Sequence, residues 1–345
     1  MQFIVGSKEE FIDFINNIKP YDNVAILTHT DLDGIASGIF LEKILQSKNI
    51  PVKLLRFGDY KNDVLTKLSP KLKHEKISKL FILDMAIDSL AFEDFEKLRK
   101  EVDIFLIDHH PKNPLLKDFK HIIKAETSNC AAQVINYLGK HFTDFKDEEW
   151  FLIPTMISEF SFKNKENIKL IQKSFPNINE NNIFESEPGK IYEIIIYGII
   201  YHNDSLNKVY DLIKNKELKS IEKYYKIIKE EINKEIDNLW KKAEFYEDKN
   251  LYFYFFKPKH RVKSIISTMV SLQKPDCSFI IATEEGSKNY LNVSARNQSI
   301  KTDMNQLMKK GIEGLKDANG GGHVAAAGAR FLKKDLNKFK ENLLR

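Results

Sequence analysis

The sequence predicts an α/β protein with two domains joined by a connector helix. The first domain is expected to be a doubly wound parallel-sheet domain, and the last a smaller α/β domain. At 345 residues the chain is long enough for about two domains of roughly 150 residues each. Short apolar runs separated by helical patterns fill its N-terminal part, as in parallel sheets. A charged helical stretch then separates them from a second group of strand-like runs.

The composition is that of an ordinary folded protein. A hydrophobic share of 42% excludes intrinsic disorder, and 54 Lys and Arg against 49 Asp and Glu give a net charge of +5, which is compatible with an anionic partner but identifies none. Two distant cysteines, Cys130 and Cys277, argue against a disulfide scaffold. Residues 1–17 lack a signal peptide's uninterrupted core, and the most apolar stretch, 192–201, has about half the length of a membrane helix. We therefore expect a cytoplasmic protein without a membrane segment.

Four short, mostly apolar runs predict strands that are buried on both faces: residues 23–28, 52–57, 79–84 and 103–108. Helical patterns lie between them. After the first run, for example, Ala36, Ile39 and Ile44 share one face of a helix. In doubly wound sheets ligands bind outside the carboxyl ends of the strands, so functional residues are expected at that edge.

Residues 212–245 are rich in lysine and glutamate and carry isoleucines at helical spacing, which predicts one long amphipathic connector helix. Later runs predict strands of the second domain: residues 251–256, 278–282, 290–295 and 326–331. The expected domain boundaries are 1–211 for the first domain, 212–248 for the connector and 249–345 for the second domain. Residues 163–190 form an excursion that is either helix or loop.

Aspartates and histidines follow three of the first four runs. Because the carboxyl ends of neighbouring parallel strands meet at one edge, and because an extended tip after the first run would alternate its side chains, we expect these groups to converge. Each alone fits a helix cap or a surface residue, but the whole set would repel itself without cations. Mixed carboxylate and imidazole ligands suit Mn²⁺, Mg²⁺ or Zn²⁺. The converging residues are His29, Asp31, Asp33, Asp84, Asp108, His109 and His110.

These residues carry a family resemblance. Asp31-Leu32-Asp33-Gly34, the isolated Asp84 and Asp108-His109-His110, in this order, resemble the first three motifs of the DHH phosphoesterase superfamily. That superfamily includes RecJ-type nucleases, oligoribonucleases, cyclic-dinucleotide phosphodiesterases and family II pyrophosphatases. Gly320-Gly321-Gly322-His323 resembles the signature of the DHHA1 domain. The chain has no room for an added OB-fold, so it is most similar to compact archaeal RecJ-like exonucleases such as the Hef-associated nuclease.

The resemblance implies a site with two divalent metal ions, Mn²⁺ in the first place and Mg²⁺ as the alternative. Asp108 would orient an imidazole, and His110 would face the substrate phosphate or the leaving oxygen. The implied ligand roles are a bridge between the ions for Asp84, the first ion for His29 and Asp31, and the second ion for Asp33, His109 and Glu159.

Glu159 is the least regular of these assignments. The superfamily's fourth motif normally supplies an aspartate, and here residues 153–160 offer a glutamate whose extra methylene displaces the carboxylate by roughly one bond length, ~1.5 Å. Asp204 is the alternative for this position. The assignment between the two stays open on the sequence alone.

The second domain offers phosphate-binding groups. Gly320, Gly321 and Gly322 leave N–H groups open for an anion-binding nest, and His323 can donate to a phosphate oxygen. Alternatively, the glycines merely allow residues 325–327 to pack closely. Arg296, which follows a predicted strand, contacts phosphate or forms a salt bridge.

A basic stripe lies between the first two strands of the second domain. It consists of Lys257, Lys259, Arg261 and Lys263, directly after the aromatic residues 252–256. Cations that follow phosphates and rings that stack on bases suit a single strand. The alternative is a solvated turn whose aromatic neighbours are buried.

Together these features predict a metal-dependent phosphodiesterase that acts as an exonuclease on single-stranded DNA or RNA in DNA repair or replication, with replication or repair proteins as partners. Two alternatives stay open: a phosphodiesterase for short oligonucleotides or cyclic dinucleotides, and a non-catalytic DHH scaffold. Homo-oligomerisation is open as well.

Overall fold

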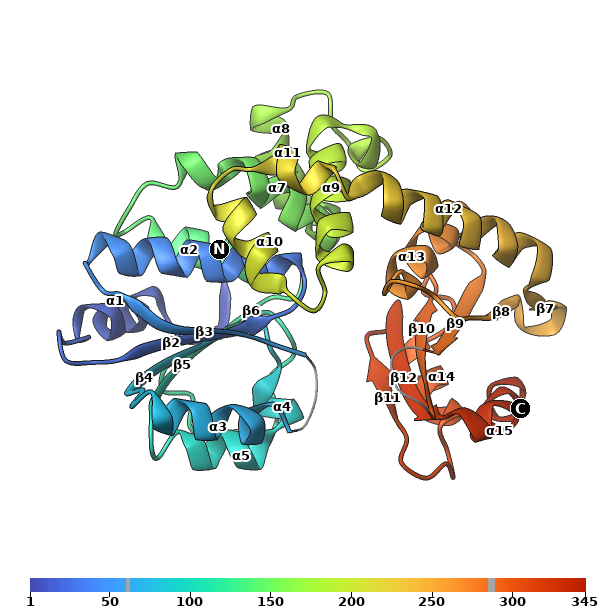
Figure 1. Ribbon diagram of the computed structural model, residues 1–345, viewed down its shortest axis with the longest axis horizontal. Coiled ribbons are helices and arrows are strands. Elements are labelled where there is room, and N and C mark those ends of the chain that lie inside the picture. The colour runs from blue at the N-terminus through green and yellow to red at the C-terminus, as the bar shows by residue number, and fades with distance from the viewer. Residues whose placement is uncertain (60–62, 285–288) are drawn as a thin grey trace. The chain divides into compact units, whose positions relative to one another are not determined.

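The computed structural model describes residues 1–59, 63–284 and 289–345. The chain divides into two compact units, Met1–Glu222 and Lys223–Arg345 (Figure 1). Both units contain a sheet covered by helices, so the predicted α/β class is confirmed. No helix in the described part of the chain is long and apolar enough to cross a membrane.

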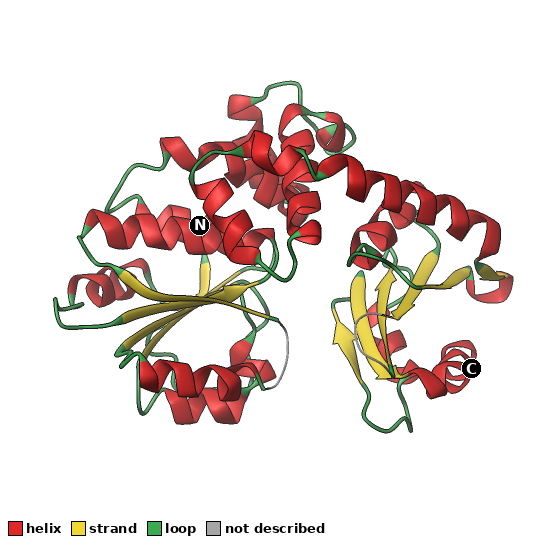
Figure 2. Cartoon of the chain, viewed as in Figure 1, coloured by secondary structure: helices red, strands yellow, loops and turns green. Residues whose placement is uncertain are grey.

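Figure 2 shows the sheet of the first unit in yellow, with helices in red. This sheet has six strands, in the order β1-β6-β5-β4-β2-β3. All neighbouring pairs are parallel except β1 with β6. The four strands expected from the apolar runs are present, whereas β1 and β6 come from runs too short to stand out. The strands are β1 (Phe3–Val5), β2 (Val24–His29), β3 (Val52–Gly58), β4 (Lys79–Leu83), β5 (Asp103–Asp108) and β6 (Ile122–Ala125).

Helices cover both faces of this sheet, as in a doubly wound fold. On one face pack α1 (Lys8–Asn16), α2 (Leu32–Ser47), α6 (Ala131–Gly139) and α7 (Glu149–Ser158). On the other pack α3 (Val64–His74), α4 (Ile87–Leu90) and α5 (Phe92–Leu98). The strands of the sheet centre, β2 and β4, are buried along almost their whole length, because two separate hydrophobic cores lie against them.

The rest of the first unit is helical and extends the core on the α2 face. Residues 163–190, for which the sequence allows helix or loop, contain α8, the 3₁₀ turn η3 and the start of α9. The elements are η1 (Lys146–Glu148), η2 (Ser161–Lys163), α8 (Lys165–Ser174), η3 (Ile183–Glu185), α9 (Glu187–Tyr201), α10 (Leu206–Lys214) and α11 (Leu218–Glu222).

The single helix expected over residues 212–245 is wrong. The stretch contains the end of α10, the short α11 and then α12 (Tyr225–Lys242). The chain turns at Lys216, whose φ of +59° is left-handed and ends a right-handed helix. The isoleucines at helical spacing therefore belong to two different helices. Ile221 lies in the core of the first unit. The buried residues of α12 include Ile228, Ile232 and Ile236.

The second unit has its own six-stranded sheet, in the order β11-β12-β10-β9-β8-β7. Only β8 and β9 run parallel; the other pairs are antiparallel. The strands are β7 (Glu244–Tyr246), β8 (Leu251–Phe256), β9 (Ser278–Glu284), β10 (Tyr290–Arg296), β11 (Asn319–Gly322) and β12 (Ala326–Leu332). The remaining elements are η4 (Glu247–Lys249), α13 (Lys263–Gln273), α14 (Met304–Gly311), η5 (Lys333–Asp335) and α15 (Leu336–Leu344).

Candidate active site

The sheet of the first unit brings the predicted aspartates and histidines to one edge. Strands β5, β4 and β2 are adjacent and parallel, so their carboxyl ends lie side by side. His29 is the last residue of β2, Asp84 follows β4, and Asp108 ends β5. All three are buried, at 9%, 1% and 0% exposure. The convergence that strand order predicted is therefore present.

Asp84 occupies the centre of this cluster. Its Oδ1 atom lies 3.3 Å from Nε2 of His109, and its Oδ2 atom lies 3.6 Å from Nδ1 of His29. The backbone of Asp84 has a left-handed φ of +56°, a conformation that aspartate adopts more readily than most residues. This local turn aims the carboxylate between the two imidazoles.

The cluster contains two groups of candidate ligand atoms, and Asp84 belongs to both. One group comprises His29, Asp31 and Asp84; the other comprises Asp84, His109 and His110. Within each group, one ligand atom from every residue lies within 4.8 Å of the others. His110, which the resemblance assigns to the substrate, also lies close enough to Asp84 and His109 to belong to the second group.

Asp31 lies beside His29 at the start of α2. Its Oδ2 atom is 2.8 Å from Nδ1 of His29, while its Oδ1 atom accepts a hydrogen bond of 2.9 Å from the N–H of Gly34 and so caps the helix. The extended tip expected through residue 33 is therefore wrong, because helix α2 already begins at Leu32.

Asp33 has a second structural role that the sequence did not indicate. Its carboxylate accepts hydrogen bonds from the N–H groups of Ala131, at 2.7 Å, and Ala132, at 2.8 Å, at the start of α6. It also lies 3.9 Å from Nε2 of His109. Asp33 thus borders the cluster without belonging to either of the two tightest groups.

Glu159 interacts electrostatically with the cluster, whereas Asp204 is exposed. Glu159 follows α7 as its C-terminal cap, and burial together with the Asp31 carboxylate raises the pKa of Glu159 to about 7. Asp204 is exposed and accepts a 3.0 Å hydrogen bond from its neighbour Asn203. Of the two residues that the sequence left open, Glu159 is the one whose pKa responds to the charges of the cluster, but it belongs to neither of the two groups of ligand atoms.

The cluster attracts positive charge. Burial by itself lowers the pKa of His29 and of His109, but Asp31 beside His29 and Asp84 beside His109 outweigh it and raise both pKa values well above the usual range. Burial and the Asp84 carboxylate raise the pKa of Asp33. These three side chains therefore bind protons more tightly than usual, because protons offset the negative charge of the neighbouring carboxylates. Carboxylate oxygens and imidazole nitrogens are also ligands that suit Mn²⁺ or Mg²⁺, so the residues fit divalent cations.

Two residues near the cluster, Lys124 and Asp88, were missed by sequence reasoning. Asp108 lies 2.7 Å from Nδ1 of His110 through one oxygen, and 2.7 Å from Nζ of Lys124 through the other. Lys124 in turn lies 2.6 Å from Asp88. The available signal was a lysine inside the otherwise apolar run 122–125, since an interior lysine requires a partner.

In the second unit, Arg296 lies beside the hairpin that carries His323. Arg296 ends β10 opposite Ala326 of β12, and the backbone N–H of His323 donates to the carbonyl of Ala326 at 2.7 Å. His323 is exposed and Arg296 is half-buried. The register of the sheet therefore places both predicted phosphate-binding residues at one end of the β11–β12 hairpin.

Gly320–Gly322 form edge strand β11 rather than an open anion-binding nest. The N–H of Gly322 donates to Oδ1 of Asn305 at 3.1 Å and so is not open to an anion. A Cβ on Gly322 would lie 2.6 Å from the carbonyl oxygen of Ala326, and the φ of Gly322 is +149°. Glycine is thus required here for close packing against β12, as the alternative interpretation held.

The basic stripe forms a turn tied to α12. Lys257, Lys259 and Arg261 are exposed, and Lys263 opens α13. Glu231 of α12 accepts a 2.7 Å hydrogen bond from the N–H of Lys259 and so fixes the turn. The stripe therefore presents its cations at the surface on a defined backbone.

The aromatic residues before the stripe belong mostly to the core. Phe253, Tyr254 and Phe256 are 2%, 5% and 8% exposed. Among the large residues of this run, Phe255 is 39% exposed, and Tyr252 is half-buried. The cationic part of the predicted strand-binding surface is thus exposed, while most of its rings are not.

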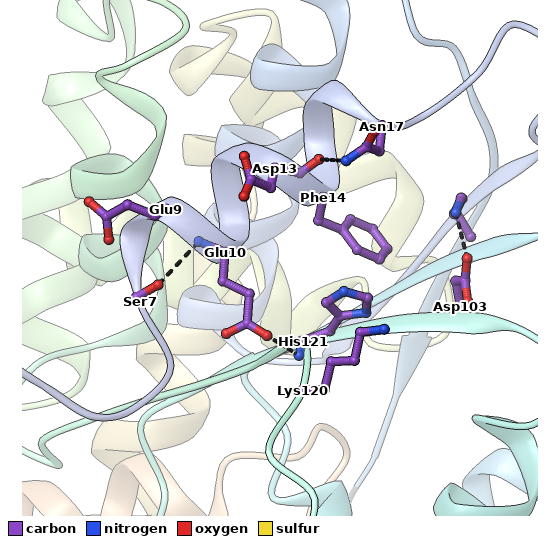
Figure 3. Close-up of a pocket in the computed structure, with 10 residues that line it drawn as sticks. Ser7, Glu9, Glu10, Asp13, Phe14, Asn17, Asp103, Lys120 and His121 are labelled. Carbon is purple, nitrogen blue, oxygen red and sulfur yellow. Dashed lines mark hydrogen bonds and ion pairs between the residues drawn. The ribbon is translucent and has the colours of Figure 1, made fainter.

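A hollow of about 640 Å³ lies at the opposite edge of the first sheet (Figure 3). It includes Lys79 and Asp103, the first residues of β4 and β5, whereas the cluster lies at the other ends of these strands. Figure 3 shows Phe14 and His121 close together in it, with Glu10 bonded to the backbone of His121. The hollow is therefore separate from the candidate site.

Two family models match the chain. The DHH family, N-terminal domain matches residues 23–159, and the DHHA1 domain matches residues 250–345. The first match contains the whole cluster, Glu159 included, and the second contains Arg296 and the glycine hairpin. No curated protein sequence matches the chain.

Solved structures share the fold at low sequence identity. The DHH domain of a member of a family of ribosomal proteins has a TM-score of 0.70 at 17% identity, over 100% of this chain and 93% of that one. Exonuclease RecJ bound to manganese has a TM-score of 0.68 at 12% identity, over 98% and 94%. RecJ from Thermus thermophilus in complex with Mn²⁺ has 0.69 at 10%, over 97% and 53%. With both family models matched in order, the chain belongs to the DHH phosphoesterase superfamily and consists of a DHH domain followed by a DHHA1 domain.

Proposed function

We propose that the protein is a metal-dependent exonuclease that hydrolyses single-stranded DNA or RNA and acts in DNA repair or replication. The superfamily to which the chain belongs is one of phosphoesterases. The proposal adds the substrate, single-stranded nucleic acid, and hydrolysis that begins at a chain end. The observation that carries it is the position of Asp84 in two adjacent groups of ligand atoms. A carboxylate shared in this way suits a pair of cations rather than one.

The ligands would divide between two sites. His29 and Asp31 would hold one ion, and His109 with Glu159 and Asp33 the other, while Asp84 bridges them. Bound there, divalent cations supply Lewis-acid activation of the phosphodiester and of water. Exonuclease RecJ has been solved bound to manganese, which supports Mn²⁺ as the first choice, and a second RecJ structure contains Mg²⁺.

The protein's own groups would bind phosphates of the substrate. His110, held by Asp108 through Nδ1, would present its other nitrogen to the substrate. In the second unit, Arg296 and His323 would bind phosphate oxygens. The exposed Lys257, Lys259 and Arg261, with Lys263, would bind phosphates further along the strand.

One observation favours a second candidate, a phosphodiesterase for short oligonucleotides or cyclic dinucleotides. Most of the aromatic residues before the basic turn are buried, and Lys257 lies 3.8 Å from Glu284. A surface with few exposed rings and a partly compensated charge suits a long strand less well. The two candidates share the metal chemistry and differ in how much substrate they hold.

The test is a hydrolysis assay with end-labelled single strands. The full chain, loaded with Mn²⁺, is incubated with a dinucleotide and with DNA and RNA strands of about 5, 10 and 20 nucleotides. We expect a ladder of products shortened stepwise from one end, and faster turnover of the longer strands. Turnover confined to dinucleotides or cyclic dinucleotides would favour the second candidate. Failure to hydrolyse any phosphodiester with Mn²⁺ or Mg²⁺ would leave the non-catalytic scaffold as the remaining interpretation.

A further inference from the structure

A lysine is buried beside the candidate active site. Lys124 lies on β6, paired in register with Asp108 of β5, and its side chain is 1% exposed. Its Nζ atom lies 2.6 Å from Oδ1 of Asp88 and 2.7 Å from Oδ2 of Asp108. Both aspartates are fully buried. A charge in such surroundings is tolerated only when it is closely paired, so the three groups hold one another in place.

The two aspartates belong to different segments of the site. Asp108 ends β5, and its other oxygen lies 2.7 Å from Nδ1 of His110. Asp88 lies in α4, just after β4, and its other oxygen accepts a 2.9 Å hydrogen bond from the N–H of Asn113. The side-chain amide of Asn113 donates to the carbonyl of Asp88 at 2.6 Å. Lys124 therefore connects the segment that follows β4 with the segment that follows β5, and both segments supply candidate metal ligands.

The network fixes which group donates to which. Burial acts to raise the pKa of Asp108, but the Lys124 ammonium and then His110 outweigh it and hold that pKa well below its usual range. Asp108 and Asp88 outweigh the effect of burial on Lys124 and raise its pKa. The ammonium of Lys124 can only donate, so the carboxylate of Asp108 accepts from it at 2.7 Å, and a carboxylate paired with a buried cation also accepts at its other oxygen. The 2.7 Å contact therefore requires that Nδ1 of His110 carries the proton, which leaves Nε2 as the nitrogen with the lone pair in the neutral ring.

We propose that Lys124 is a positioning residue for the phosphodiesterase reaction: it holds Asp108 so that Asp108 fixes the tautomer and the orientation of His110. The reaction itself rests on the proposed function. Without the ammonium, Asp108 would face the carboxylate of Asp88 in a buried space, and one of them would take up a proton or move away. Asp108 would then no longer have to accept from Nδ1, and His110 could rotate or change tautomer.

The first measurement needs no variant. The imidazole ¹⁵N resonances of the Mg²⁺-loaded full chain report which nitrogen of each histidine carries a proton, and His110→Gln assigns the signals of His110 by their loss. We expect His110 to be protonated at Nδ1. A parent protein in which His110 carries its proton at Nε2 alone, with a bare Nδ1, overturns the proposal.

The second measurement uses a variant that conserves the net charge of the network. Lys124→Met alone leaves two facing carboxylates and is expected to fold poorly. Lys124→Met combined with Asp88→Asn removes one positive and one negative charge and leaves a neutral amide beside Asp108. In this double variant we expect the His110 ¹⁵N signals to change to a mixture of tautomers. We also expect kcat to fall about 10- to 100-fold, the usual effect of losing a group that orients a site residue, with little change in KM.

A matched control and the opposite outcome complete the test. Lys43→Met breaks a 2.5 Å ion pair with Glu148 in the same unit, away from the cluster, and should change neither kcat nor the His110 signals. If the double variant folds and keeps the parent's kcat and ¹⁵N pattern, Lys124 is only a structural residue. If it does not fold, a parent spectrum with the His110 proton at Nε2 alone still overturns the proposal. A parent that hydrolyses no phosphodiester contradicts the proposed function, whereas the ¹⁵N spectra continue to test the effect of Lys124 on His110.

Discussion

The Oδ1 atom of Asp84 lies 3.3 Å from the Nε2 atom of His109, although the two residues follow different strands. The opposite oxygen of the same carboxylate faces His29 at 3.6 Å. One side chain thus connects the two groups of candidate ligands. Loss of its charge should disturb both groups at once, which makes Asp84 the most informative position for a first substitution.

Asp84→Asn should lower phosphodiesterase activity by several orders of magnitude, because an amide is a poor bridge between two cations. The fold should survive, since asparagine also adopts the positive φ of +56° that this position requires. Initial rates at saturating Mn²⁺ measure the first effect.

Thermal unfolding with and without Mn²⁺ provides the control. Ligand binding stabilises the parent by about 2.7 kcal/mol at a free concentration about 100 times Kd, and the variant should show a much smaller rise in Tm. Parent-like rates in Asp84→Asn would refute the bridging role.

Glu159→Gln should raise the Mn²⁺ concentration required for half-maximal activity, because a half-buried carboxylate that interacts with the charge of Asp31 becomes neutral. Glu159→Asp should keep or lower that concentration, since it restores the residue type usual in the superfamily's fourth motif. Asp204→Asn, at an exposed position, is the matched control and should leave the metal titration unchanged. A shift caused by Asp204→Asn rather than by Glu159→Gln would reverse the assignment.

The metal-free protein should lose stability as the pH rises from about 4.5 to about 7. Burial and Asp31 raise the pKa of Glu159 from 4.5 to about 7, so the folded state binds a proton more tightly than the unfolded state does. The stabilisation is therefore complete below pH 4.5 and is lost as the pH rises through the folded-state value. The loss amounts to at most about 3 kcal/mol.

Urea unfolding in EDTA at about pH 5 and about pH 8 measures this change. The glutamine of Glu159→Gln does not titrate. The unfolding free energy of this variant should therefore decrease less between about pH 5 and about pH 8 than that of the parent. An equal decrease in both proteins would show that other groups cause it.

Charge reversal of Lys257, Lys259, Arg261 and Lys263 should weaken the binding of strands of about ten or more nucleotides and flatten the salt dependence. Dinucleotide hydrolysis should be almost unaffected, because distant phosphates exist only in longer substrates. Fluorescence anisotropy over a salt series, together with dinucleotide turnover, separates the two effects.

The matched control reverses four exposed lysines of the first unit, Lys163, Lys165, Lys169 and Lys173, with the same change in net charge. If the stripe variant and the control behave alike, the stripe is only a solvated turn.

His323→Ala and Arg296→Ala should act differently from the stripe and lower turnover of every substrate, dinucleotides included.

The sequence predicted best what depends on apolar runs and short motifs. The strands β2, β3, β4 and β5 are strongly apolar, and a parallel sheet necessarily brings their carboxyl ends together, so Asp84 and Asp108 could be placed before any coordinates. Strand β1 has three residues and β6 four, too few for a periodic signal.

The remaining features depend on contacts between distant segments. The residues next to Lys124 in the sequence do not indicate that it forms ion pairs with Asp88 and Asp108. Glycine disfavours strands, so residues 320–322 do not predict the edge strand β11, and only the close approach of Ala326 shows why Gly322 must be a glycine. The break at Lys216 is a single left-handed residue within an otherwise good helical composition.

The hydrogen bonds from Ala131 and Ala132 to Asp33 span 98 and 99 positions of the chain, and this separation bears on the order of folding. Closing so long a loop costs entropy before any contact compensates for it, so we expect the start of α6 to meet Asp33 after the local contacts have formed. A cation that needs the finished edge of the sheet cannot nucleate the early chain. A bound cation would instead lower the rate of unfolding, because it holds together the segments that pack last.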